Sequence, residues 1–251
     1  MSFPNTIYGQ SGWEKVQTST QKHKIGTRMT FDDGRVFRYS EVGGVNIAAG
    51  AVVQAPVAVA HHDVDLAITT AASGVTEVTV TLENTATTLN QYKDGYLFIN
   101  DGVTGEGHVY KIKSNPVASG NATCAITLYE DDPTITALTN GTHIAGLVVN
   151  PYSNVIISPT TVTNMAIGVA PRLLTTEYFG WLQTWGPASV LAIAAGVVGQ
   201  HIRVGGSGTA GGTNPLDRDG SAEDEQAIGV QMQIAPTSAG DYGLVYLTIT
   251  P

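Results

Sequence analysis

The sequence feature that most constrains the fold is an alternation of apolar and polar residues with a period of two. It is clearest over residues 74–82, where valine and threonine alternate as they do on a half-exposed strand. Further runs rich in β-branched and aromatic residues follow, separated by turn clusters such as Asn100-Asp101-Gly102 and Asp131-Asp132-Pro133. No stretch shows the 3.6-residue period of a helix, so the pattern argues against a mainly helical fold.

The runs predicted as strands are residues 74–82, 95–100, 107–113, 121–129, 155–157, 178–187, 188–194, 201–204, 227–234 and 243–250. A spacing of roughly 10–15 residues per strand, with turn residues between, is typical of an antiparallel sandwich or barrel. The predicted fold class is therefore all-β, with antiparallel β-sandwich or β-barrel units. A short helix competes only over the alanine-rich residues 188–195, and the flanking Pro187 and Gly196 favour strand and turn.

A hairpin is predicted near the start of the chain. Asp33-Gly34 lies between two runs rich in β-branched and aromatic residues, and both residues tolerate the positive φ that a two-residue turn needs. Counting outward from that turn places Phe31 opposite Val36, on the face that does not carry Phe37. Both faces of the hairpin would then carry apolar groups, so we expect both to be covered.

Three segments are expected along the chain. Residues 1–25 are polar and have no pattern that could build a core, which predicts an extended N-terminal arm. A β-rich domain with the hairpin and an antiparallel sheet is predicted over residues 26–155. A β-barrel-like domain is predicted over residues 156–251.

The composition narrows the class of protein. Only 13% of the residues are charged, about half the share of an ordinary soluble domain, so polar uncharged side chains or partners must cover the surface. The net charge of −9 argues against nucleic-acid binding, which needs clustered Lys and Arg. The single cysteine, Cys124, excludes an internal disulfide. Neither a signal peptide nor an apolar run of about 18 residues is present, so we expect no membrane contact and synthesis in a cytoplasm.

Motifs that would carry chemistry are weak. Residues 206–211 match a dinucleotide-binding pattern, but Pro215 follows where a helix should begin, so a loop and no cofactor are predicted. On a strand, His61, Asp63 and Asp65 would share one face as half of a metal site, with a solvated strand edge as the alternative. The loop from Asp217 to Glu225 alternates oxygen ligands that could recruit calcium or keep the surface acidic. No metal site and no catalytic residue are predicted.

The aromatic cluster of residues 178–185 is the most informative local feature. On a strand, Trp181 and Trp185 would point to the same side, either into a barrel core or into a subunit contact, since tryptophan is enriched in interface hot spots. The residues predicted to form a subunit or capsid interface are Tyr8, Trp13, Trp181 and Trp185.

The sequence around this cluster resembles the C-terminal half of the head decoration, or cement, proteins of tailed bacteriophages. The pattern from Tyr178 is aromatic-Gly-Trp-Leu-Gln-Thr-Trp-Gly-Pro-Ala, followed by a glycine-rich step at residues 196–199 and a short strand at 201–204. A Gly/Thr loop, Ala227-Ile228-Gly229-Val230 and a last strand ending near Thr250 complete it. Residues 34–39 and 50–54 look like the opening of such proteins, and residues 60–150 have no counterpart.

The resemblance implies a non-enzymatic virion protein that binds the outside of a capsid and stabilises it by mass action. Its partners would be the major capsid protein and copies of itself, most commonly in a homotrimer. It would be assembled in the host cytoplasm and would act without a cofactor. The alternatives are another virion component, such as a head fibre, tail or baseplate protein, a carbohydrate-binding β-sandwich that stacks sugar on Trp181 or Trp185, and an enzyme.

Overall fold

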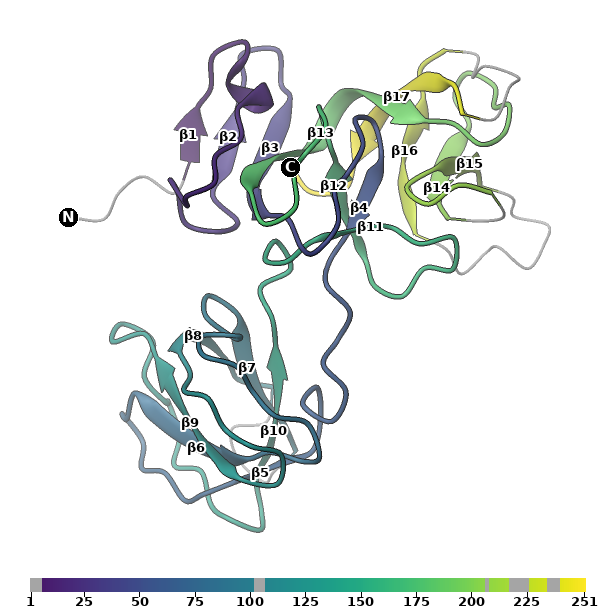
Figure 1. The fold of residues 1–251 in the computed structure, drawn as a ribbon. Coiled ribbons are helices and arrows are strands. Elements are labelled where there is room, and N and C mark those ends of the chain that lie inside the picture. Colours follow the sequence, from purple (N-terminus) through teal and green to yellow (C-terminus); the bar gives the residue numbers. More distant parts are fainter. Residues whose placement is uncertain (1–5, 102–106, 206–207, 217–225, 234–239) are drawn as a thin grey trace. The chain divides into compact units, whose positions relative to one another are not determined.

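The computed structural model describes residues 6–101, 107–205, 208–216, 226–233 and 240–251 (Figure 1). The all-β prediction is confirmed. Seventeen strands are present, and the only helical element in the described parts of the chain is a single 3₁₀ turn, Trp13–Lys15. No helix among these residues is long and apolar enough to cross a membrane.

The chain forms two compact units, and their boundaries differ from the predicted ones. Residues 58–150 form one unit, here called the inserted barrel, and residues 1–57 together with 151–251 form the other, here called the framework. The insertion lies between two paired strands of the framework. Gln54 of β4 (Val52–Gln54) pairs with Ile156 of β11 (Ile156–Ile157), so the chain leaves the framework and returns to it at neighbouring positions. A prediction that followed the chain in order could not bring together two segments about 100 residues apart in sequence.

The framework is built on an 11-stranded mixed sheet. Its main path runs through β1 (Thr6–Tyr8), β2 (Arg28–Thr30), β3 (Val36–Glu41), β13 (Phe179–Leu191), β17 (Tyr242–Thr248), β16 (Ala227–Gln231), β14 (His201–Val204) and β15 (Thr213–Pro215). β12 (Ala166–Val169) pairs with β13 and β4. The 13-residue β13 is the centre of the unit, because β3 pairs with its first half and β17 with its second half.

The predicted hairpin is present, but its register is one residue off. Thr30 pairs with Val36, and Phe31 donates its backbone N–H to the carbonyl of Arg35 at 3.0 Å. The loop therefore has three residues, with Gly34 at φ 84°, in place of a two-residue turn. The shift moves Phe31 onto the same face as Phe37, and their rings lie 5.2 Å apart in one apolar cluster.

The described part of the predicted arm, residues 6–25, packs on the framework. β1 pairs in parallel with β2, and Thr18 exchanges two backbone hydrogen bonds with Phe179 at 2.9 and 2.8 Å. Glu14 is only 4% exposed. This segment packs on a core that other segments form, so it needs no apolar pattern of its own. For that reason the sequence alone predicted an arm.

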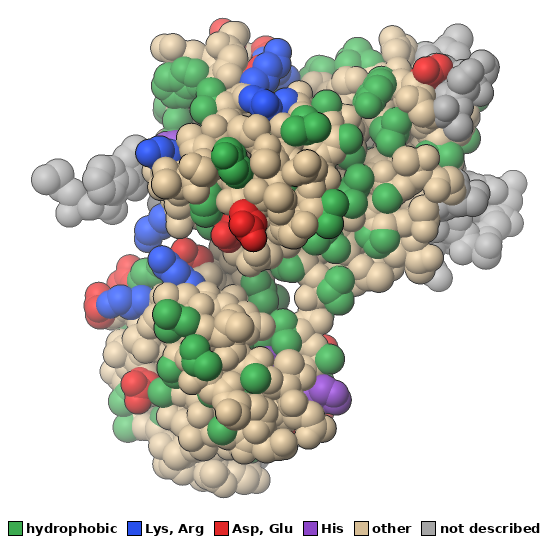
Figure 2. Space-filling view, in the orientation of Figure 1, with side chains coloured by type: hydrophobic (Ala, Val, Ile, Leu, Met, Phe, Trp, Pro, Cys, Tyr) green, Lys and Arg blue, Asp and Glu red, His purple; other side chains and the backbone are tan. Residues whose placement is uncertain are grey.

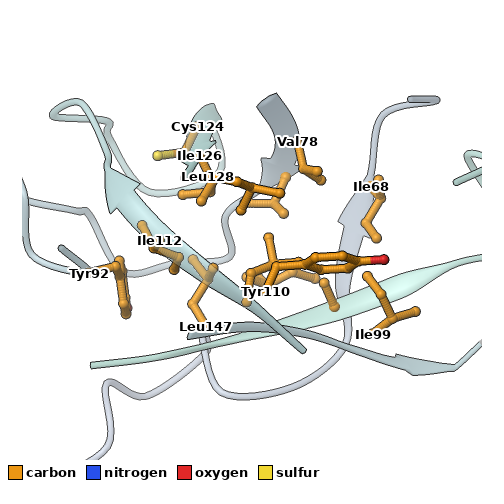
Figure 3. Packing of buried hydrophobic residues seen from close by; sticks show 14 of the residues in the cluster. Ile68, Val78, Tyr92, Ile99, Tyr110, Ile112, Cys124, Ile126, Leu128 and Leu147 are labelled. Atoms are coloured by element: carbon orange, nitrogen blue, oxygen red, sulfur yellow. The ribbon is translucent and has the colours of Figure 1, made fainter. Parts of the chain in front are cut away.

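The inserted barrel is a closed sheet of six antiparallel strands in the order β10-β5-β6-β9-β8-β7. The strands are β5 (Leu66–Ile68), β6 (Glu77–Thr81), β7 (Tyr96–Asp101), β8 (Val109–Ser114), β9 (Thr123–Leu128) and β10 (Ile144–Val148). Their inward side chains form one core that includes Tyr110 and Cys124, and Tyr92 joins this core from the turn before β7 (Figure 3). Closure leaves no free sheet edge, and each fully buried leucine or isoleucine stabilises the fold by about 1.5–3 kcal/mol.

The barrel has an internal pseudo-two-fold arrangement. Exchanging β5, β6 and β7 with β8, β9 and β10 preserves the neighbours in the barrel. It exchanges β10-β5 with β7-β8 and β5-β6 with β8-β9, and it maps β6-β9 and β7-β10 onto themselves. Two reciprocal backbone bridges obey the same exchange, since Ala71 with Leu138 maps onto Ala118 with Thr87. Three residues after each bridging residue, the chain adopts positive φ, at Gly74, Asn90, Asn121 and Gly141. These four positions are here called the corners of the barrel, and the two halves have the same sign of φ at corresponding corners.

Candidate functional site

The framework exposes a sheet face without charged side chains. β17 alternates exposed and buried residues, so Tyr242, Leu244 and Tyr246 point outward with exposed fractions of 49%, 36% and 37%. Register places Tyr246 between Pro187 of β13 and Val230 of β16. The sequences of β13, β16 and β17 hold no Asp, Glu, Lys or Arg.

Two more side chains extend this surface. Met232, 40% exposed, follows β16 and donates its backbone N–H to Leu244. Trp185 is half-buried, with its ring centroid 6.0 Å from that of Tyr246 in an edge-to-face contact. The outward side chains together are here called the uncharged face: Trp185, Pro187, Ser189, Val230, Met232, Tyr242, Leu244 and Tyr246.

Most charged side chains of the framework lie outside β13, β16 and β17, although the exposed Asp241 directly precedes β17. In the view of Figure 2, Lys and Arg side chains gather over the β1–β3 part of the unit, and hydrophobic side chains lie over the β16 and β17 part. Near β3, Arg35 donates from Nε to Asp33 at 2.7 Å. Partial burial works to raise the pKa of Asp33, but the hydrogen bonds and charge of Arg35 hold it below its ordinary value.

The four predicted interface residues have different surroundings. Trp181 is 5% exposed and packs with Tyr39 in the framework core at a ring distance of 5.0 Å, so the core alternative holds for this residue. Trp185 contributes to the uncharged face. Tyr8 and Trp13 are 82% and 44% exposed, and both belong to the N-terminal segment. The structure therefore does not bring the four into one site.

A cavity of about 500 Å³, here called the Glu14 pocket, opens at the edge of the uncharged face and shares Pro187, Ser189 and Tyr242 with it. Its polar lining comes from Glu14, Lys15, Arg35, Gln183, Ser189 and Tyr242. Its apolar lining includes Val169, Pro171 and Pro187. Sequence reasoning missed the pocket, because Glu14 lies in a segment without any periodic pattern and is far from β13 in sequence.

The segment around His61 is a turn and not the predicted strand. His61 and Asp65 have positive φ, at 68° and 62°, which breaks the alternation that would align them with Asp63. His61 Nδ1 lies 3.2 Å from Glu83, and Asp65 accepts a hydrogen bond from Asn100 at 2.8 Å. Within the described residues, no three His, Cys, Asp or Glu side chains gather as metal ligands. The Asp217–Glu225 loop and Gly206-Ser207 lie outside those residues.

The inserted barrel buries a polar group of its own. His62 is fully buried, with Nδ1 2.6 Å from the Tyr92 hydroxyl and Nε2 2.8 Å from the Thr85 carbonyl. Because that carbonyl can only accept, Nε2 donates to it, and Nδ1 shares the second hydrogen bond with the Tyr92 hydroxyl. Burial also raises the pKa of the Cys124 thiol, although a contact with Thr87 works to lower it. These groups are enclosed by the core, so they hold the barrel together and offer no open site.

Comparison with known proteins adds no relative. No family model, no curated protein and no solved structure matches this chain.

Proposed function

We propose that this chain is a structural protein of a virus particle, of the head decoration type, which binds the outer surface of a tailed-phage capsid and stabilises it. The observation that carries the proposal is the uncharged face. Folded monomers rarely leave a contiguous apolar patch open unless a partner covers it. Tyrosine, tryptophan and methionine are also the residues enriched where proteins bind one another.

The charge of the chain supports association through this face. At a net charge of −9, two copies repel each other, and a partner of the same sign repels them too. The strands β13, β16 and β17 hold no charged side chain, so their own outward residues bring no like charges into the contact. We therefore propose that the uncharged face contacts a subunit of the capsid or a neighbouring copy of the chain, with a trimer as the favoured oligomer.

The proposed work is thermodynamic and needs no catalytic step. A protein that binds only the mature shell stabilises it in proportion to the logarithm of its concentration over the dissociation constant. Each Å² of apolar surface that the contact buries contributes about 25 cal/mol before the costs of association. The proposed partners are the major capsid protein and further copies of this chain, and the proposed location is the capsid exterior.

The direct test is a count of copies. Particles of the virus that encodes the chain are purified, and the chain is counted against the major shell protein by quantitative peptide mass spectrometry. A ratio near that of the shell subunits supports the decoration role. A few copies per particle move the chain to a fibre, tail or baseplate, and absence from the particle overturns the proposal.

A matched pair of variants tests the face itself. Leu244→Asp places a carboxylate in the uncharged face, and we expect it to abolish binding to purified mature shells. Leu89→Asp adds the same charge at a side chain of the inserted barrel that is 67% exposed, and we expect it to bind like the parent. Equal binding by both variants would assign the contact to another surface.

A further inference from the structure

We propose that the Glu14 pocket binds a neutral sugar residue, such as one pyranose unit of a glycan. The inference concerns the framework alone and stands whether or not the chain belongs to a virus particle. It places sugar binding at a different site from the one that the sequence suggested, because Trp181 is in the core and cannot stack on a sugar.

Glu14 supplies the acceptor. Its side chain is 5% exposed, and Oε2 accepts the backbone N–H of Gly12 at 2.7 Å. Oε1 lies 3.8 Å from Arg35 Nη1, which is longer than a hydrogen bond. A buried carboxylate is costly unless its oxygens are hydrogen-bonded. Oε1 therefore remains available to a hydroxyl that enters the pocket.

Arg35 supplies donors beside it. Asp33 binds its Nε, and the guanidinium carbon lies 4.9 Å from the ring centroid of Phe31, so the group is fixed from two sides. Its Nη groups make no hydrogen bond to another described residue. A hydroxyl both donates and accepts, so neighbouring hydroxyls of a sugar can bridge the carboxylate and the guanidinium.

The charges at the pocket favour a neutral ligand. The lining holds one carboxylate, Glu14, and two cations, Lys15 and Arg35, and Asp33 outside the lining balances the second cation by binding Arg35 Nε. A ligand with a net charge would gain nothing from this balance. A polyhydroxylated ligand uses the donors and acceptors without bringing a charge of its own.

Part of the pocket lining is apolar. The Tyr242 ring packs on Gly50, where an added Cβ would lie 2.6 Å from Cε1, and the ring is still half exposed. Pro171 and Pro187 also line the pocket. An aromatic ring and two prolines offer a flat surface to the C–H face of a pyranose, and a volume of about 500 Å³ is within the range of small-ligand sites.

The strand edge next to the pocket is closed to an added peptide strand. After Trp185, β13 pairs with β17 alone among the described strands. On the open side, Gln183 Nε2 donates to the carbonyls of Trp185 at 3.1 Å and Pro187 at 2.7 Å, and Pro187 has no N–H. These features block backbone pairing, as they do on protected edge strands. A compact ligand fits the pocket better than an extended peptide.

Saturation-transfer NMR on the isolated chain tests the proposal, with the methyl glycosides of glucose, galactose, mannose and N-acetylglucosamine as probes. We expect transfer to at least one glycoside, with a Kd of about 1 mM. Loss of the charged acceptor in Glu14→Gln, or of the ring in Tyr242→Ala, should weaken binding about tenfold or more. Tyr96→Ala, which removes a tyrosine of the inserted barrel, should bind like the parent.

The proposal is overturned if none of the four glycosides receives saturation, or if Glu14→Gln and Tyr242→Ala both bind like the parent. Thermal melts establish that each variant is folded. If Glu14→Gln does not fold, Tyr242→Ala decides, because half of that side chain is exposed. Copy counting on particles does not enter this test, so the two proposals can fail separately.

Discussion

The framework and the inserted barrel differ in how they satisfy the edges of their sheets and how they pack their cores. The barrel closes its sheet and packs its inward side chains into one apolar cluster. The framework leaves its sheet open and distributes its core over three clusters. A closed sheet needs nothing further to satisfy its edges, whereas an open sheet needs caps such as Gln183 or a partner.

The two units also differ in net charge. The barrel segment holds ten Asp and Glu and three Lys and Arg, a net charge of −7, whereas the framework holds eleven and nine, a net charge of −2. Most of the net charge is therefore in the unit that is complete by itself. The framework, with little net charge and an uncharged face, is the unit suited to close contact with a partner.

Excising the barrel is expected to have the largest effect and to separate the two units. Joining Val57 to Pro151 through a short Gly/Ser linker closes the β4–β11 hairpin, whose strands already pair at Gln54 and Ile156. We expect the shortened framework and residues 58–150 each to fold, and calorimetry of the full chain to show two transitions that match them. A single transition, or an unfolded framework, would show that the units depend on each other.

Leu97→Ala should destabilise the barrel alone. Leu97 is fully buried, and truncating a buried leucine costs about 2–5 kcal/mol. In calorimetry of the full chain, we expect the transition that corresponds to residues 58–150 to move down and the other to stay in place. Leu89→Ala, at a side chain 67% exposed, is the control and should leave both transitions unchanged. A shift of both transitions by Leu97→Ala would contradict the division into units.

Strands with strong alternation could be predicted from sequence, whereas β10 and β12, which each contain a glycine, could not. The run at residues 74–82 contains β6, and the prediction for residues 201–204 matches β14. β10 and β12 were missed, since Gly146 and Gly168 look like turn residues. Close packing leaves no room for a side chain at either glycine. An added Cβ would lie 2.2 Å from the Asp63 carbonyl oxygen at Gly146 and 2.8 Å from Leu182 Cβ at Gly168.

The candidate site was harder to predict than the fold. β17 was predicted as a strand, but the sequence did not show that its outward side would have no cover. The Glu14 pocket depends on Arg35, Gln183 and Tyr242, which only the folded sheet brings together. Tryptophan was used as an interface marker, and burial separates Trp181 from Trp185, because a strand residue points to the core or to solvent according to pairing that is not local.

Alkaline pH should weaken the barrel. Burial raises the pKa of Tyr92, with the charges of Cys124 and Asp63 adding to the effect, and burial followed by the hydrogen bond to Asp94 raises the pKa of Tyr129. The unfolded chain loses these protons at about pH 10, and the folded barrel keeps them to higher pH. Their contribution to the free energy of unfolding is therefore complete below about pH 10 and falls as pH rises further.

Denaturant unfolding of residues 58–150 between about pH 8 and about pH 11 measures this fall. Tyr129→Phe removes one of the two groups, so its free energy of unfolding should depend less on pH above about pH 10 than that of the parent. A free energy of unfolding that does not change over this range would contradict the raised pKa values.

The smallest expected effect tests the pseudo-two-fold arrangement of the barrel. Gly74 has φ 83° and no atom within 4 Å of an added Cβ, so Gly74→Ala meets backbone strain without a clash and should cost about 1 kcal/mol. Gly74→Asn should cost less, because asparagine tolerates positive φ and already occupies the symmetry-related corner as Asn121. Urea unfolding of residues 58–150 compares the two variants. An equal loss of unfolding free energy in both variants would mean that the corners at Gly74 and Asn121 differ in more than their backbone conformation. A smaller loss for Gly74→Asn would show that both halves of the barrel accept asparagine at the corresponding corner.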